Sequence, residues 1–243
     1  SARPTIEFAK ANTAMSHAAD NRTLKHGCIV MASGVGARFG GNKLMAELCD
    51  VPLVGHVVRA TDGLFSRRVV VTCHADVAAL CETLGAQVIL HDEPCRNDTV
   101  RLGMEVMGGC DTVTFVQGDQ PLIRPASIVA LLRAAERDAA GAARRDAAGC
   151  GVTDVSGCPS ACIWRTCFDG VPGAPVLFPS WTFGELRSLP HGKGGGFVAK
   201  AHAECVRTIE VSNEWELFDV DTRDDLEQLQ THVARCGSAG LPR

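Results

Sequence analysis

Short apolar runs alternate with segments of helical periodicity along the first part of the chain. The predicted strands cover 28–32, 68–72, 87–90 and 112–117, and the predicted helices cover 53–61, 76–84, 98–107 and a segment from Pro125 toward Ala139. Strands that are joined by helices favour parallel pairing, because each helix returns the chain to the same edge of the sheet. The sequence therefore predicts an α/β fold with a doubly wound, mostly parallel sheet.

The first predicted strand runs into a glycine-rich loop that carries two cations. Gly34 and Gly36 allow positive φ angles and let backbone N–H groups approach an anion, and Arg38 and Lys43 add full positive charges. In an open α/β sheet, ligands bind outside the carboxyl ends of the strands, which is where this loop begins. The loop therefore predicts a site for a polyanion, and a plain tight turn between strand and helix is the alternative.

Two familiar glycine loops do not match these residues. A P-loop has lysine directly after its last glycine and then Ser or Thr, but Gly41 is followed by Asn42, and Leu44 follows Lys43. A dinucleotide-binding loop has a third glycine where this chain has Phe39. The polyanion site is therefore of another kind.

Four segments together form an ordered set of motifs. They are the series from Ala32 to Leu44, the pentapeptide Gly118-Asp119-Gln120-Pro121-Leu122, the segment 173–178 and the segment 219–226. In this order they resemble the nucleotide-binding signature, the metal loop and two later elements of the nucleotidyltransferases related to molybdenum cofactor cytidylyltransferase. The resemblance covers residues 27 to 230. It implies a Rossmann-like nucleotidyltransferase fold with a small added strand pair, 161–168 and 175–178, as one wall of the acceptor pocket.

Length and composition favour one domain. The chain has 243 residues, of which 46% are hydrophobic and 21% charged, enough for one large core. We expect a nucleotidyltransferase domain over 25–236, an N-terminal extension over 1–24 and a loose tail over 237–243. Residues 137–151 are expected to be a fraying helix end and a loop, followed beyond the strand pair by a helix over 181–189, a strand over 206–211 and a helix over 224–235.

Charge and hydropathy limit the partners that the chain can have. A net charge of −4 gives no general attraction for nucleic acid or for an anionic membrane. No apolar run is long enough to span a bilayer, and the N-terminal stretch is polar, so a cytoplasmic protein is expected. The twelve cysteines are then expected to be free thiols.

The resemblance also implies a set of site residues. The nucleotide-binding residues would be Ala32, Ser33, Gly34, Gly36, Arg38, Lys43 and Thr99. Asp119 and Asp221 would hold magnesium, with Asp219 as a neighbour. Arg38, Lys43 and Asp119 would be the catalytic residues. Lys43, Arg38 and Asp119 can converge because their loops leave the carboxyl ends of the first and fourth strands.

Each assignment has a structural alternative. Asp119 could cap a helix or close an Asx turn, and Asp221 also suits the N-terminus of the helix that follows it. Lys43 could be a solvated surface lysine. Thr99 lies in a segment similar to the R-x-D-S-V segment of methylerythritol phosphate cytidylyltransferases and would lie near the cytosine. The alternative is a plain helix with Asp98 or Thr99 as its N-cap.

The function that the resemblance implies is transfer of CMP from CTP to the phosphate of molybdopterin, with release of pyrophosphate and with Mg²⁺ as cofactor. The acceptor phosphate is already an anion, so no nucleophilic side chain is required, and the histidines, His74 among them, are expected to be structural or surface residues. A molybdenum hydroxylase would receive the product. The alternatives are a different phosphorylated acceptor, such as methylerythritol phosphate or a sugar phosphate, and a non-catalytic carrier of the molybdenum cofactor.

Two departures from the family pattern bear on the substrates. Ser33 stands where guanylyl-transferring relatives have glycine and cytidylyl-transferring relatives have alanine, which leaves the base partly open. The loop from Leu189 to Gly196 lacks the usual acceptor-side aspartate and carries Lys193 among glycines. Such a loop suits an anionic group, and it would also serve as a flexible lid.

Overall fold

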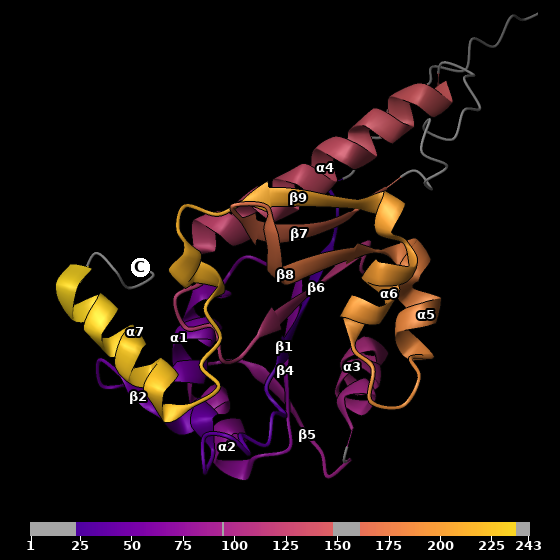
Figure 1. The fold of residues 1–243 in the computed structure, drawn as a ribbon. Coiled ribbons are helices and arrows are strands. Elements are labelled where there is room, and N and C mark those ends of the chain that lie inside the picture. The colour runs from indigo at the N-terminus through magenta and orange to yellow at the C-terminus, as the bar shows by residue number, and fades with distance from the viewer. Residues whose placement is uncertain (1–22, 94, 148–160, 237–243) are drawn as a thin grey trace, which may run out of the picture.

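The computed structural model describes residues 23–93, 95–147 and 161–236. The core is a seven-stranded sheet with the strand order β5-β4-β1-β6-β8-β7-β9 (Figure 1). These strands are β1 (His26–Met31), β4 (Arg67–Thr72), β5 (Gln87–Leu90), β6 (Thr112–Gln117), β7 (Ile163–Phe168), β8 (Val171–Pro179) and β9 (Val206–Glu210). A separate two-stranded antiparallel sheet joins β2 (Glu47–Leu48) to β3 (Val51–Pro52).

The sheet is mostly parallel, as the alternation of strands and helices predicts. Parallel pairing joins β5 to β4, β4 to β1, β1 to β6 and β7 to β9. The hairpin of β7 and β8 enters antiparallel, with β8 against β6. This hairpin is the added strand pair that the sequence predicts, and its turn lies at Asp169 and Gly170, both with positive φ angles.

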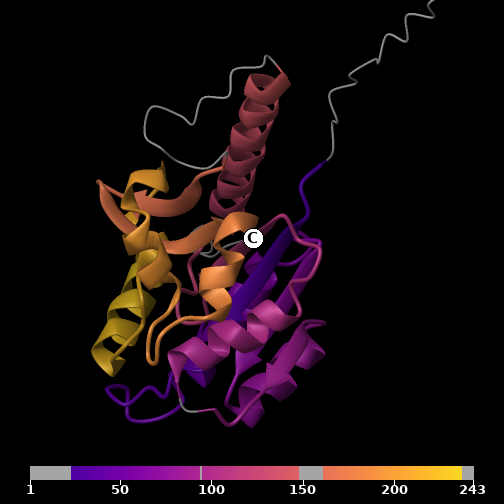
Figure 2. The same ribbon diagram turned by 90° about the vertical axis from the view of Figure 1, so that its right-hand side faces the viewer.

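Helices cover both faces of the sheet, which is why its strands are apolar on both sides. In β1, the side chains of Cys28 and Val30 pack on one face, while Ile29 packs on the other. The first face is covered by α1 (Leu53–Ala60), α2 (Ala75–Thr83) and the start of α4 (Pro125–Ala147). The second face carries α3 (Arg96–Glu105), α5 (Phe183–Arg187) and α6 (Gly195–Ala201). Figure 1 shows α1 and α2 on one side of the sheet and α3, α5 and α6 on the other, and Figure 2 views the molecule from the second of these sides.

The C-terminal helix α7 (Arg223–Cys236) closes a third cluster beside α1 (Figure 1). Leu229 and Val233 of α7 pack in this cluster with Phe39 of the glycine-rich loop and Leu122, which follows β6. Helix α7 is thereby held beside two loops that leave the carboxyl ends of β1 and β6. This packing brings residues 219–221, which precede α7, to the same edge of the sheet.

Most predicted elements are confirmed, while some differ in extent and others were not predicted. Helix α4 continues to Ala147 instead of ending near Ala139, because the alanine and arginine residues beyond that point favour helix and the single Gly141 does not end it. The predicted helix over 181–189 is a 3₁₀ turn, Ser180–Thr182, followed by the short α5. Helix α6 was not predicted, because glycines occupy its start.

Residues 1–22 of the predicted N-terminal extension lie outside the described residues, and so does the predicted tail over 237–243. Nine cysteines in the described part of the chain are free thiols, as expected. The expectation is wrong for Cys205, which is disulfide-bonded. Among the described residues, no helix is long and apolar enough to cross a membrane.

Candidate functional site

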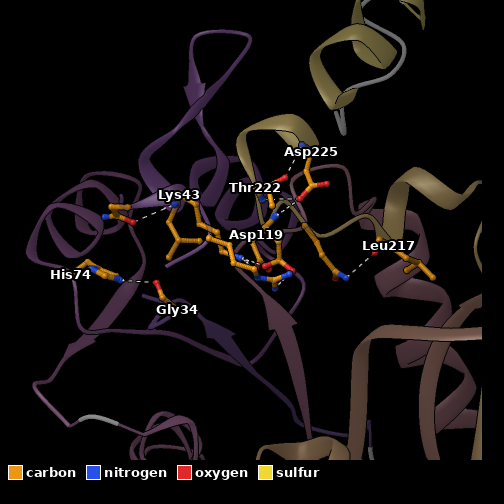
Figure 3. Close-up of polar contacts among 12 residues, drawn as sticks. Gly34, Lys43, His74, Asp119, Leu217, Thr222 and Asp225 are labelled. Carbon is orange, nitrogen blue, oxygen red and sulfur yellow. Dashed lines mark hydrogen bonds and ion pairs between the residues drawn. The ribbon is translucent and has the colours of Figure 1, made fainter. Parts of the chain in front are cut away.

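Lys43 lies at the centre of a cluster of charged residues at the carboxyl ends of β1 and β6. Its Nζ is 2.6 Å from Asp119 Oδ2 (Figure 3) and 2.7 Å from Asp221 Oδ1. The residue is only 6% exposed, so the alternative of a solvated surface lysine is wrong. Burial lowers the pKa of Lys43, but the two carboxylates outweigh that effect and raise it. Lys43 is therefore a fixed cation.

Arg38 supplies a second cation to the same carboxylate. Its Nη2 lies 2.6 Å from Asp221 Oδ2, while most of the Arg38 side chain is exposed. The hydrogen bond from Lys43 is the main reason that the pKa of Asp221 is lowered, and Arg38 adds to that effect. Asp221 is thus ionised and joins the two cations of the glycine-rich loop.

The Asp221 side chain does not cap helix α7. At the start of α7, the Asp225 carboxylate accepts hydrogen bonds from the N–H groups of Asp221 and Thr222, and the Thr222 hydroxyl accepts one from the Asp225 N–H (Figure 3). Thr222 and Asp225 therefore perform the capping, and the Asp221 side chain faces Lys43 instead. The Asp119 side chain likewise pairs with Lys43.

Close backbone contacts hold the aspartates in place. The Gly118 N–H donates to the Met31 carbonyl, and a Cβ atom at position 118 would lie only 3.1 Å from that oxygen, so glycine permits the approach. The Val220 N–H donates to the Asp119 carbonyl, which ties the segment before α7 to the loop after β6.

The nearby Asp219 has its pKa raised to about 6, first by burial and then by Asp119.

The two carboxylates match the requirements of a divalent cation. Asp119 and Asp221 present oxygen atoms to one shared positive group, the Lys43 ammonium. Magnesium prefers oxygen ligands and is usually bound by one or two carboxylates together with substrate phosphates. No cluster of three or more His, Cys, Asp or Glu side chains suited to a metal occurs in the described ranges. The site therefore fits a metal that arrives with phosphate ligands.

Unpaired backbone donors line the glycine-rich loop. Across the described ranges, the N–H groups of residues 33–38 have no hydrogen-bond acceptor in the protein. Gly36 has a φ of 61°, and a Cβ atom there would clash with the Gly41 carbonyl, so this part of the loop requires glycine. Successive free N–H groups beside fixed cations form an anion-binding surface.

Six of the seven predicted nucleotide-binding residues line one cavity of about 370 Å³. They are Ser33, Gly34, Gly36, Arg38, Lys43 and Thr99, joined by Asp119 and Asp221. Ala32, which was predicted with them, is fully buried and does not line this cavity. Thr99 is buried inside α3, whose N-cap is Cys95, so the alternative that Thr99 or Asp98 caps this helix is wrong.

A larger cavity of about 1530 Å³ adjoins the first one. The two share Met31, Arg38, Arg96, Gln117, Asp119 and Asp221. The larger cavity also contains Arg165, Lys193 and Lys200, and its apolar lining includes Phe115, Phe168, Val171, Phe178, Phe197 and Leu217. Among its cations, sequence reasoning missed Arg165 and Lys200, because no motif marks them and only the packing of β7 and α6 brings them to this cavity.

The loop that carries Lys193 is attached to the start of α3. The Gly192 N–H donates to Asn97 Oδ1 at 2.9 Å, and Cys95 Sγ lies 2.9 Å from His191 Nε2. Gly192 to Gly196 line the larger cavity, and a Cβ atom at Gly195 would lie 2.7 Å from the Phe115 ring. Glycine is therefore needed at position 195 for the loop to pack against β6.

Comparisons with known proteins agree with this architecture. A curated relative, the 3-deoxy-manno-octulosonate cytidylyltransferase of Anaeromyxobacter sp. (strain Fw109-5), is 36% identical over 113 residues, which are 41% of this chain and 44% of the relative. The aligned part thus spans less than half the length of this relative, and the same holds for the relative from Elusimicrobium minutum.

Three solved structures share the fold. Rv0371C of Mycobacterium tuberculosis H37Rv in complex with manganese has a TM-score of 0.60 at 22% identity, over 85% of this chain and 98% of that one. A CMP:2-keto-3-deoxy-manno-octonic acid synthetase complexed with CTP has a TM-score of 0.61 at 16% identity, over 88% and 100%. Molybdopterin-guanine dinucleotide biosynthesis protein A from Archaeoglobus fulgidus has a TM-score of 0.57 at 18% identity, over 86% and 99%.

A family model accounts for most of the described chain. The model for the MobA-like NTP transferase domain matches residues 28–206, from β1 to the first residue of β9. The match includes the glycine-rich loop, Asp119 and the β7–β8 hairpin. This protein therefore belongs to the family of MobA-like NTP transferase domains.

Proposed function

We propose that this protein transfers CMP from CTP to the phosphate of molybdopterin and releases pyrophosphate. The observation that carries the proposal is the junction of the two cavities. Free N–H groups and the cations Arg38 and Lys43 line the smaller cavity, and Asp119 and Asp221 stand where it opens into the larger one. A triphosphate in the smaller cavity would present its α-phosphorus to an acceptor in the larger cavity.

The residues at this junction fit the requirements of nucleotidyl transfer. The barrier lies in bringing two anions together and in stabilising the charge of the leaving pyrophosphate. The N–H groups of residues 33–38, with Arg38 and Lys43, would neutralise and orient the triphosphate. Asp119 and Asp221 would hold Mg²⁺, which supplies further positive charge to the phosphates when bound. The acceptor phosphate itself attacks, so no protein nucleophile takes part.

The larger cavity supports a planar acceptor with an anionic group. Arg96, Arg165, Lys193 and Lys200 provide positive charge. Phenylalanine side chains and exposed Val171 and Phe197 provide apolar surface. A pterin with a phosphate uses both kinds of surface, whereas a sugar acid or a sugar phosphate leaves the aromatic surface unused. The same nucleotide could serve another acceptor, and the curated relatives named above favour a sugar acid as the second candidate.

The test is to mix the protein with CTP, Mg²⁺ and molybdopterin, and to measure pyrophosphate and the cytosine dinucleotide. We expect both products in equal amounts. Methylerythritol phosphate, 3-deoxy-manno-octulosonate and a sugar phosphate serve as competing acceptors. Faster turnover with one of these would overturn the molybdopterin assignment, and binding of molybdopterin without pyrophosphate release would identify a carrier instead of an enzyme.

A further inference from the structure

Residues 72–76, which we call the strap, hold the carbonyl side of the glycine-rich loop. The Thr72 hydroxyl donates to the Ala32 carbonyl at 2.7 Å, Cys73 Sγ to the Ser33 carbonyl at 3.5 Å, and His74 Nε2 to the Gly34 carbonyl at 3.0 Å. Figure 3 shows the contact between His74 and Gly34. Three consecutive side chains thus donate hydrogen bonds to three consecutive backbone carbonyls.

This pattern determines where the N–H groups of the loop point. In a trans peptide, the N–H of one residue points opposite to the carbonyl of the residue before it. With the carbonyls of residues 32–34 turned toward the strap, the N–H groups of Ser33, Gly34 and Val35 point away from the strap. These three residues line the smaller cavity, and within the described chain their N–H groups have no acceptor.

The strap also holds the far end of the loop. Asn42 Nδ2 donates to both oxygens of Asp76, at 2.9 and 3.0 Å, while Asn42 Oδ1 accepts from the Leu44 N–H. The Thr72 hydroxyl in addition accepts a hydrogen bond from the His74 N–H at 3.1 Å, which connects the strap internally. Both ends of the loop are therefore attached to one short segment at the start of α2.

We propose that the strap is a positioning element, which aims the free N–H groups of the loop at the phosphates of the nucleotide. This inference rests on the proposed function and names residues that act on that site without touching the substrate. His74 and Asp76 do not line the smaller cavity. His74 is also the N-cap residue of α2, but its side chain makes no capping hydrogen bond, so we expect its replacement to leave the helix start unchanged.

The experiment measures binding of CTP with Mg²⁺, and of tripolyphosphate with Mg²⁺, by calorimetry. Tripolyphosphate lacks a base, so it reports on the phosphate part of the site. We expect His74→Ala to bind both probes about 3- to 10-fold more weakly, the effect of losing one neutral hydrogen bond. His74→Gln retains an N–H donor on a side chain of similar reach and should bind within about twofold of the wild type.

Asp76→Ala provides an independent test, in which the direction of the change in affinity is informative. Removing a negative charge near an anion site by itself strengthens anion binding, so a loss of affinity reports the lost hydrogen bonds of Asp76, which come from Asn42 and from the Val77 N–H. The matched control is Glu82→Ala, which removes an exposed carboxylate from the other end of α2. We expect Asp76→Ala to weaken binding about threefold and Glu82→Ala to leave it unchanged or slightly stronger.

The outcomes separate the strap from the function of the site. If the wild type binds both probes and His74→Ala binds them equally well, the strap proposal fails and the proposed function stands. Equal losses in His74→Gln and His74→Ala would also overturn it, because a donor at that position would then be irrelevant. If the wild type binds neither probe, the phosphate site and the proposed function fail together.

Discussion

Lys43 Nζ lies 2.7 Å from Asp221 Oδ1, although 178 residues separate the two positions in the chain. The contact joins the loop after the first strand of the sheet to the segment before the last helix. It forms because α7 packs against Phe39 and Leu122, beside the loops that leave β1 and β6. The charge cluster at the site therefore depends on the docking of α7.

Replacing Lys43 should strongly slow transfer. The ammonium is buried and paired with two carboxylates, so Lys43→Ala removes the central cation of the junction. We expect kcat/KM to fall by about 10²–10³-fold, as for the loss of one preorganised charge-stabilising group. Steady-state pyrophosphate release measures the effect, and circular dichroism checks the fold. Wild-type turnover by a folded Lys43→Ala protein would remove Lys43 from the mechanism.

Activity should require a divalent cation that Asp119 holds. Asp119→Asn keeps the size of the side chain but removes the charge that a magnesium ligand needs. We expect activity to be lost on chelation in the wild type, and Asp119→Asn to need a much higher Mg²⁺ concentration for half-maximal rate. Asp221→Asn should show the same direction. A normal magnesium titration in Asp119→Asn contradicts the assignment.

Lys193 should act on the acceptor and not on the nucleotide. It is exposed on the glycine loop and lines the larger cavity but not the smaller one. We expect Lys193→Ala to raise the acceptor KM by about 3- to 10-fold and to leave the CTP KM unchanged. Arg187→Ala, an exposed cation outside both cavities, is the control. An equal rise in both KM values would place Lys193 elsewhere.

CTP should be preferred to GTP despite Ser33. With the base against the cavity wall at Ser33, the side chain of this residue would take up room that the second ring of a purine needs. The Ser33 hydroxyl contacts the Val71 carbonyl and His91 at 3.2 and 2.9 Å. Pocket size and a few hydrogen bonds typically discriminate by about 10–200-fold. Competition between the two nucleotides at equal concentration decides the point, and a product pool dominated by the guanine dinucleotide would reverse the assignment.

Acid should destabilise the fold partly through His56. Burial lowers the pKa of this imidazole below its ordinary value of 6.5, against the hydrogen bond to the Leu48 carbonyl. The unfolded chain binds the proton more tightly, so this contribution to stability is fully present above pH 6.5 and is lost as the pH falls below it. Denaturant unfolding between pH 5 and 7 should show a smaller pH dependence in His56→Gln. An unchanged slope contradicts the buried neutral imidazole.

The sequence by itself determined the order and type of most elements. Apolar runs such as 112–117 are buried on both faces, so their pattern depends on little besides local composition and the need for a core. The positions of the glycine-rich loop and of Asp119 followed from the same pattern, because parallel strands place their carboxyl ends at one edge. The end of α4 and the start of α6 were harder to predict, since alanine-rich and glycine-rich segments give weak signals for where a helix begins or ends.

Only the tertiary structure decided which side chains meet. Asp221 could cap a helix or face Lys43, and the choice depended on Thr222 and Asp225, which provide the cap. His74 carries no motif, yet it reaches the Gly34 carbonyl because β4 and β1 are adjacent and in parallel register. Local patterns report which face a residue buries, but contacts between distant segments depend on the packing of the whole sheet and its helices.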